Sequence, residues 1–156
     1  MKAFKIKLVS VAFNNRSKEL TVVYRNGKKV VLHYGQLGLK GNLAAAGVDP
    51  ESAGYALFLE YVNGKREFVP YDTPLLIVQD PDYLLQDSIE NLVADIRKKL
   101  RATKISKKYL ARSLKTSDIQ IERLLDSRIL NKNLVQLNEI AHCLGASLEL
   151  SLKRAA

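Results

Sequence analysis

The sequence is poor in the residues that build metal centres and disulfide scaffolds, since it contains one cysteine and two histidines. The single cysteine, Cys143, cannot form a disulfide within the chain. His142 precedes it on a predicted helix, where adjacent side chains point in different directions, and His33 lies in a distant predicted strand. Without spaced partners these residues make neither a metal site nor a nucleophile–base pair. We therefore expect no metal and no cofactor.

Residue patterns typical of enzymes are also missing. The acidic residues are scattered, and none of them forms a carboxylate pair at a spacing useful for acid–base catalysis. The glycine-bearing segment GQLGLKG (35–41) lacks the Gly-Lys-Ser/Thr ending of a phosphate-binding loop and does not lead into a clear helix. The sequence therefore predicts a protein that is not an enzyme.

Long apolar runs are absent from the sequence. No segment approaches the roughly 20 apolar residues of a membrane-spanning helix. The N-terminal MKAFKIKLVSVAF alternates charged with apolar residues and lacks the uninterrupted apolar region of a signal peptide. Together with the scarcity of cysteine, these features predict a cytoplasmic protein without membrane contact.

Positive charge, in contrast, is abundant and unevenly distributed. The 156 residues carry a net charge of +9, and their hydrophobic share of 47% is ordinary for a folded protein. Residues 1–87 contain 11 basic and 9 acidic side chains, whereas residues 88–156 contain 14 and 7. This asymmetry indicates that the C-terminal part, rather than the N-terminal part, meets a polyanion.

The first half of the sequence has the two-residue period of β-strands. Phe4, Ile6 and Leu8 alternate with lysines, which predicts one buried and one exposed face. LLIV at 75–78 predicts another short strand, and the glycine-rich segment 35–52 a loop with at most one helical turn. Together with the hairpins described next, about five strands are expected in a small, mainly antiparallel β domain.

Two hairpins are predicted from Asn-Gly dipeptides. ELTVVYR and KKVVLHY flank Asn26-Gly27, a dipeptide that suits a type I′ turn because both residues tolerate positive φ. YALFLEYV and KREFV flank Asn63-Gly64 in the same way. These are the clearest strand pairings that the sequence offers.

The period becomes helical after Asp80-Pro81. From Ser88, the expected N-cap, apolar residues recur at intervals of three and four. They are Ile89, Leu92, Val93, Ile96 and Leu100. We place the domain boundary at residues 80–87, which separates a β-rich domain (1–82) from a helical domain (83–156) and makes the chain an α+β protein.

A helix-turn-helix pattern follows within a strongly basic stretch. Residues 97–115 contain nine basic side chains and no acidic one. Ser106 is expected to cap KKYLARSL, and Ser117 to cap DIQIERLLD after a turn at Thr116. A last helix runs from Leu134 to Leu144, and SLELSL (147–152) alternates like a terminal strand. The residues expected in the shared core are Leu110, Ala111, Leu114, Ile121, Leu124, Leu125, Leu134, Leu137, Ile140, Ala141 and Leu144.

These motifs resemble the helix-turn-helix domain of the lambda-repressor (XRE) superfamily, and most closely the DNA-binding part of HicB- and HigA-type antitoxins. The resemblance covers Leu92 to Leu152 and is carried by IRKKLRATKIS, the Leu110-Ala111 pair, SLKTS, IERLLD and LVQLNEIAHCLGASLELSL. The sequence departs from the family at Lys115, where glycine is common, and at Lys107, where glutamine is usual. A left-handed Lys115 would cost about 1 kcal/mol. The first half is not the usual N-terminal domain of HicB antitoxins and resembles small β domains of unknown function fused to such modules.

The resemblance implies that the helix from Ser117 to Asp126 enters the major groove of DNA. Gln120 would then pair with adenine and Arg123 with guanine. The implied base-edge contacts are Asp118, Ile119, Gln120 and Arg123. The implied phosphate contacts are Ser106, Lys107, Lys108, Arg112, Lys115 and Ser117. Glu122 conflicts with phosphate and would either accept a hydrogen bond from cytosine or turn away.

We therefore expect a sequence-specific transcriptional regulator that binds double-stranded DNA as a homodimer, on half-sites about one helical turn apart. An antitoxin-like autorepressor would use residues 1–82 to hold a toxin or another protein, or to form the dimer. The alternative is an interaction module whose β domain binds a protein or ligand. Its helical domain would then be a non-specific nucleic-acid anchor or a dimerisation element.

Overall fold

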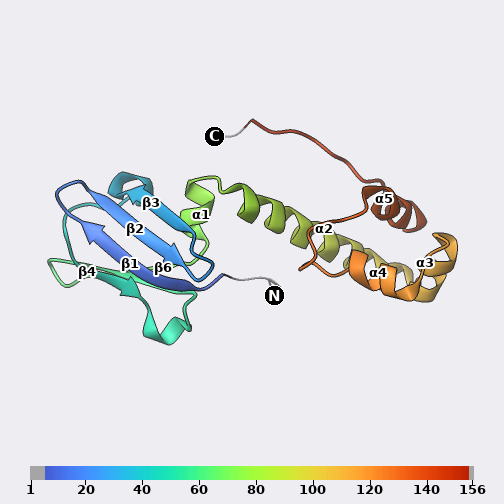
Figure 1. The fold of residues 1–156 in the computed structure, drawn as a ribbon, viewed down its shortest axis with the longest axis horizontal. Helices are drawn as coiled ribbons and strands as arrows, with labels where there is room; N and C mark the ends of the chain where they lie inside the picture. Colours follow the sequence, from blue (N-terminus) through green and yellow to red (C-terminus); the bar gives the residue numbers. More distant parts are fainter. Residues whose placement is uncertain (1–5, 155–156) are drawn as a thin grey trace. The chain divides into compact units, whose positions relative to one another are not determined.

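The chain is an α+β protein with two small antiparallel sheets followed by helices, as the computed structural model shows for residues 6–154 (Figure 1). Two compact units are present, a β unit within Lys5–Tyr83 and a helical unit within Leu84–Ala156. No helix of the described chain is both long enough and apolar enough to cross a membrane.

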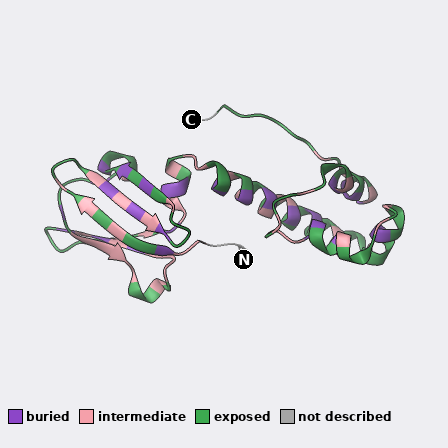
Figure 2. Cartoon of the chain, viewed as in Figure 1, coloured by how far each residue is buried: buried purple, intermediate pink, exposed green. Residues whose placement is uncertain are grey.

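The first three strands form one antiparallel sheet in the order β1-β2-β3. They are β1 (Leu8–Asn14), β2 (Glu19–Tyr24) and β3 (Lys29–His33). Along β2 every second side chain is buried, and the alternation predicted from the sequence is visible as alternating colours in Figure 2. The strand predicted around Phe4, Ile6 and Leu8 begins at Leu8, and Phe4 lies outside the described residues.

The second antiparallel sheet has the order β4-β5-β6. It consists of β4 (Leu43–Val48), β5 (Ala56–Tyr61) and β6 (Arg66–Pro70). The prediction of a loop over 35–52 is wrong, because β4 lies inside it, between the 3₁₀ turns η1 (Tyr34–Leu37) and η2 (Pro50–Ser52). Alanine and glycine gave β4 no strand signature, yet a Cβ on Gly47 would lie only 2.9 Å from the Phe58 ring. A side chain at position 47 would therefore force the partly exposed Phe58 ring to shift.

Both predicted hairpins are confirmed, β2–β3 and β5–β6, but their turns are not type I′. Among the described residues near these turns, positive φ occurs at Gly27 (85°) and Gly64 (84°) but not at the preceding asparagines. The N–H of Gly27 donates to the Tyr24 carbonyl, which closes a turn with the left-handed glycine at its end. Asn26 accepts a hydrogen bond from the Lys28 N–H through its side chain instead of adopting positive φ itself.

Asn15 links the two sheets of the β unit. Its Nδ2 donates to the Leu43 carbonyl at 2.8 Å, and its Oδ1 accepts from the Leu43 N–H at 2.9 Å. The Tyr34 hydroxyl donates to the same Oδ1 at 2.9 Å. Buried side chains from both sheets form the core of this unit, among them Leu20, Val22, Tyr24, Val30, Leu32, Leu43, Leu57 and Leu59.

The segment LLIV (75–78) is helical, so the strand predicted there is wrong. It lies in and just after α1 (Thr73–Ile77), which has Pro74 in its first turn. Leu75 is almost fully buried, whereas Leu76 is 45% exposed. Because a short apolar run fits a buried strand and a buried helical turn equally well, the period alone could not separate them.

The long helix α2 (Pro81–Thr103) begins earlier than the sequence predicted. Asp80 accepts a hydrogen bond from the Tyr83 N–H at 2.9 Å, and Pro81 occupies the first helical position, where a missing N–H costs little. The prediction that Ser88 is the N-cap is therefore wrong. Ser88 lies inside the helix and donates its hydroxyl to the Leu84 carbonyl.

The first turn of α2 is attached to the β unit. The Lys28 ammonium lies 2.5 Å from an Asp80 carboxylate oxygen and 3.0 Å from one of Asp82. The Tyr83 hydroxyl donates to the Asp72 carboxylate at 2.9 Å. These contacts explain why the β unit extends to Tyr83, within the helix, and not merely to its start.

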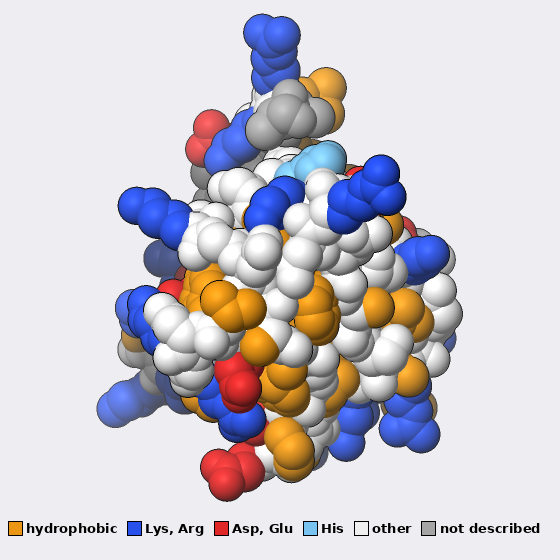
Figure 3. Space-filling model, turned by 90° about the vertical axis from the view of Figure 1, so that its left-hand side faces the viewer, with side chains coloured by type: hydrophobic (Ala, Val, Ile, Leu, Met, Phe, Trp, Pro, Cys, Tyr) orange, Lys and Arg blue, Asp and Glu red, His pale blue; other side chains and the backbone are white. Residues whose placement is uncertain are grey.

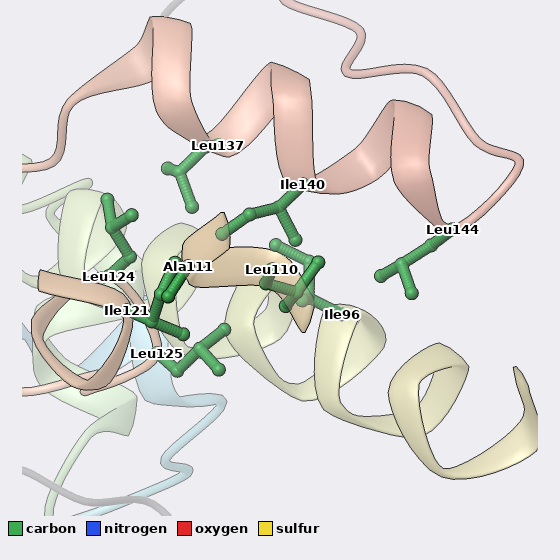
Figure 4. Close-up of a cluster of buried hydrophobic side chains, with 9 residues drawn as sticks. All are labelled: Ile96, Leu110, Ala111, Ile121, Leu124, Leu125, Leu137, Ile140 and Leu144. Atoms are coloured by element: carbon green, nitrogen blue, oxygen red, sulfur yellow. The ribbon is translucent and has the colours of Figure 1, made fainter. Parts of the chain in front are cut away.

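Three short helices pack on α2 in the helical unit. They are α3 (Lys107–Ser113), α4 (Asp118–Leu124) and α5 (Leu134–Cys143). Figure 4 shows the side chains of their shared core, Ile96, Leu110, Ala111, Ile121, Leu124, Leu125, Leu137, Ile140 and Leu144. Two predictions fail here: Leu134 is 46% exposed at the start of α5, and residues 147–152 form no strand.

Candidate nucleic-acid interface

The helices α3 and α4 are joined by the four residues Leu114–Ser117, the connection length of a helix-turn-helix. Both predicted N-caps are confirmed. The Ser106 hydroxyl accepts from the Tyr109 N–H, and the Ser117 hydroxyl accepts from the Gln120 N–H, each at 3.1 Å. Each cap satisfies one of the free N–H groups at a helix start and so fixes where the helix begins.

The turn between the helices depends on Lys115, whose φ is 51°. This left-handed conformation ends α3, with the Thr116 N–H donating to the Ala111 carbonyl at 2.9 Å. Glycine would adopt it without a steric penalty, whereas lysine is strained here by about 1 kcal/mol. In return, Lys115 adds an exposed cation at the turn.

Two cations hold the C-terminal end of α4. The Arg97 guanidinium donates to the Leu125 carbonyl at 2.7 Å, and the Lys132 ammonium donates to the carbonyls of Arg123 and Asp126 at 2.7 and 2.5 Å. Positive groups at this end also suit the helix dipole. Burial lowers the pKa of Lys132 below its usual range, opposed by the nearby Asp126. Arg97 therefore has a structural contact that the basic run gave no reason to expect.

The outer side of α4 is exposed to solvent. Asp118 and Arg123 are exposed, and Ile119 is 73% exposed. A hollow of about 670 Å³ between α2 and α4 is lined by Arg97, Ile119 and Arg123. A second hollow of about 330 Å³, beside the loop after α4, is lined by Arg123 and Asn131. Arg123 therefore borders both hollows.

Gln120 differs from the other predicted base-contact residues. It is only partly exposed, and its Nε2 donates to Oε1 of Gln136 in α5 at 2.7 Å. The bond fixes the plane of the Gln120 amide and leaves its Oε1 as an acceptor. Gln136 was not predicted as a site residue, because the partners lie 16 positions apart in the sequence and on different helices.

Glu122 neither turns away nor remains unpaired. Its carboxylate lies 2.5 Å from the Lys107 ammonium, in a salt bridge that connects α3 with α4. Both side chains are about half exposed, so the pair is solvated and weak as a source of stability. The bridge nevertheless neutralises the charge at Glu122 and occupies Lys107, which was predicted to contact phosphate.

The remaining predicted phosphate contacts are exposed. Lys108, Arg112 and Lys115 have no acidic partner among residues 6–154. Ser106 and Ser117 use their hydroxyl oxygens as caps, which leaves each hydroxyl hydrogen able to donate. Five of the six predicted phosphate contacts are thus accessible, and Lys107 is occupied by Glu122.

The loop after α4 is stabilised by an ion pair. The Arg128 guanidinium makes two hydrogen bonds to the carboxylate of Asp126, at 2.9 and 2.8 Å. These bonds, together with the Arg128 N–H, hold the pKa of Asp126 well below its usual range. The loop therefore has a defined conformation beside the exposed end of α4.

Neither a metal centre within the described residues nor a matching known protein points to a function. Within residues 6–154, no three His, Cys, Asp or Glu side chains gather where a metal ion would be held. No protein-family model, curated protein or solved structure matches the chain. Function must therefore be inferred from the geometry of the helical unit.

Proposed function

We propose that this protein is a sequence-specific DNA-binding transcriptional regulator of the lambda-repressor-like class, with α4 as the recognition helix. The observation that carries the proposal is the exposed outer side of α4, which follows α3 after a four-residue turn and is held at both ends by side chains. It bears an exposed Arg123 whose side chain has no partner among the described residues. A helix held in this way can enter the major groove without losing its shape.

The charges around α4 support the same function. Lys108, Arg112 and Lys115 are free to neutralise phosphates, which supplies affinity without reading sequence. Arg123 has the bidentate geometry that reads guanine, and the exposed Ile119 offers an apolar surface for a thymine methyl group. Gln120, oriented by Gln136, presents an acceptor suited to the amino group of adenine or cytosine.

Arg123→Lys tests this proposal directly. The substitution keeps the positive charge but removes the bidentate fork. Discrimination at one guanine of the preferred site should fall by about 1–3 kcal/mol, while binding to unrelated DNA and its salt dependence stay unchanged. Fluorescence anisotropy with cognate and scrambled duplexes measures both quantities. An equal loss of affinity for both duplexes would show that Arg123 does not contact a base specifically.

Dimerisation and an antitoxin role extend the proposal. One helix-turn-helix makes few base contacts, so a homodimer on two half-sites is the form expected to be specific. As an autorepressor of the antitoxin kind, the protein would use its β unit to hold a toxin. Location in the cytoplasm follows from this role.

A second function, protein binding by the β unit, is favoured by one feature of its second sheet. Phe58 and Phe68 are direct cross-strand partners, and Phe68 is 59% exposed. The Arg66 guanidinium lies 5.1 Å from the centre of the Phe58 ring. Figure 3, which views the left-hand side of Figure 1, shows apolar side chains gathered near the middle of that surface and basic ones toward its edge. Replacing Phe68 with serine should weaken partner binding but leave DNA affinity unchanged.

A further inference from the structure

The segment after α5 ends the described chain as an extended ribbon with no secondary structure (Figure 1). Gly145, with φ of 71°, and a hydrogen bond from the Ala146 N–H to the Ala141 carbonyl terminate the helix. Leu148 packs partly against the core of the helical unit. Beyond it, Leu150 is 68% exposed and Leu152 fully exposed.

This segment has the residue pattern of a β-strand, but it pairs with no other strand of the described chain. Leu148, Leu150 and Leu152 alternate with polar residues, so an extended backbone places all three leucines on one face. Within the described chain, no backbone hydrogen bond involves residues 147–154. A segment with one apolar row and unpaired N–H and C=O groups is a template for another strand.

We propose that residues 147–153 pair antiparallel with the same residues of a second copy of this chain. A two-fold axis through Leu150 places Leu150 opposite Leu150 of the second copy, and Leu148 opposite Leu152 of the second copy. All the leucines then lie on one face of the ribbon. On the other face Glu149 has two diagonal neighbours in the second copy, Lys153, which is favourable, and Glu149, which is not. The dimer therefore contains two Glu149–Lys153 pairs and one Glu149–Glu149 pair.

The register also explains how the most exposed leucine becomes covered. Leu148 already touches the core of its own helical unit. Pairing brings Leu152 of the second copy beside Leu148, so the leucine row bridges the edges of two helical cores. This support matters because a two-stranded ribbon alone is marginally stable in water. The occupant is a second copy, rather than another strand, because this register places each leucine opposite a leucine and gives two opposite-charge pairs against one like-charge pair.

The first test compares Leu150→Lys with Ser151→Lys in the full chain. The two changes add the same charge at adjacent positions. Leu150→Lys places two ammonium groups opposite each other at the axis, whereas Ser151→Lys faces Glu149 of the second copy. Sedimentation velocity without DNA should show a dimer for the parent and for Ser151→Lys. The dimer dissociation constant of Leu150→Lys should be about a hundredfold higher or more.

A monomeric parent, or equal dissociation constants for the two lysine variants, would overturn the proposal. Both positions are exposed, so circular dichroism should show unchanged helix content in either variant. Equal dissociation constants would overturn this interface alone and leave the proposed DNA binding untouched, whereas a monomeric parent would also contradict the proposed homodimer.

Cross-linking tests the register independently. In a Cys143→Ser background, Leu150→Cys places two thiols opposite each other at the axis, and mild oxidation should give a covalent dimer. Ser151→Cys is the matched control, since the two copies of residue 151 are separated by two positions across the ribbon. Cross-linking of Ser151→Cys as fast as Leu150→Cys would contradict the register.

Discussion

Glu122 is the residue at which charge and proposed function conflict most directly. A carboxylate on the exposed side of a recognition helix repels phosphate, yet here it lies 2.5 Å from Lys107. The bridge cancels one positive and one negative charge where α3 and α4 meet. It therefore limits the electrostatic affinity of the surface without abolishing it, since Lys108, Arg112 and Lys115 stay free.

Glu122→Gln should release Lys107 for contact with phosphate. We expect tighter binding to duplex DNA of any sequence and a slope of log K against log salt that steepens by about 0.9. Folding stability should change by about 0.5 kcal/mol or less, because the pair is exposed. The control is Glu139→Gln, which removes an exposed, unpaired carboxylate of the described chain from α5. An equal change of slope in the control would show that the effect comes from net charge and not from the release of Lys107.

Asp126 should make the helical unit sensitive to acid. Arg128 lowers the pKa of its carboxyl in the folded protein, so the ionised form stabilises folding above the unfolded pKa of about 3.9. That stabilisation is lost as the pH falls toward the lower folded pKa. The urea midpoint of the protein should exceed that of Asp126→Asn at pH 7, and the difference should shrink from about pH 4 downward. Asp95→Asn, which removes one exposed carboxyl from α2, is the matched control.

At the level of elements, α4 is a short helix whose two ends are fixed by side chains from elsewhere in the fold. Ser117 caps its start, while Arg97 of α2 and Lys132 of the following loop bind its last carbonyls. A seven-residue helix is unstable by itself, so these contacts and the buried Ile121 and Leu124 must hold it.

Lys132→Met should destabilise α4 in particular. The substitution retains the aliphatic stem but removes hydrogen bonds to two carbonyls, which should cost about 1 kcal/mol of unfolding free energy. Specific DNA binding should weaken along with it. Lys98→Met, which removes an exposed cation from α2, should leave stability within about 0.5 kcal/mol. Equal stability of the two variants in urea unfolding would show that Lys132 does not support the helix.

The same elements show what local sequence can predict. Alternation and Asn-Gly dipeptides located both hairpins, and serine caps located α3 and α4. Strand β4 was missed because alanine and glycine lack the β-branched signature, and the close approach of Gly47 to Phe58 involves another strand. LLIV was misassigned because four apolar residues do not define a period.

The candidate site, too, has features that the local sequence predicts and contacts that it does not. Its exposed residues on α4 followed from periodicity and capping, which are local. The contacts of Arg97 with Leu125 and of Gln120 with Gln136 join residues 28 and 16 positions apart, so no local pattern contains them. Sequence therefore predicted which residues are available, whereas the folded chain shows which of them are already occupied.

At the scale of the whole molecule, the excess positive charge belongs mainly to the helical unit, whereas exposed apolar side chains occur in both units. Residues 88–156 carry most of the excess positive charge, and the exposed Phe68 with its partner Phe58 lies in the β unit. This charge asymmetry suits the proposed DNA binding by the helical unit, and the exposed Phe68 suits the proposed protein binding by the β unit. Helix α2 connects the two, with its first turn attached to the β unit through Lys28.

The most direct test of sequence-specific DNA binding is selection of random duplex DNA by the purified full chain, followed by sequencing, at a low and a high salt concentration. We predict recovery of one motif at both concentrations, with two related half-sites about one helical turn apart. Binding that enriches no motif and collapses at high salt would contradict the account, because it would leave only contacts to phosphate.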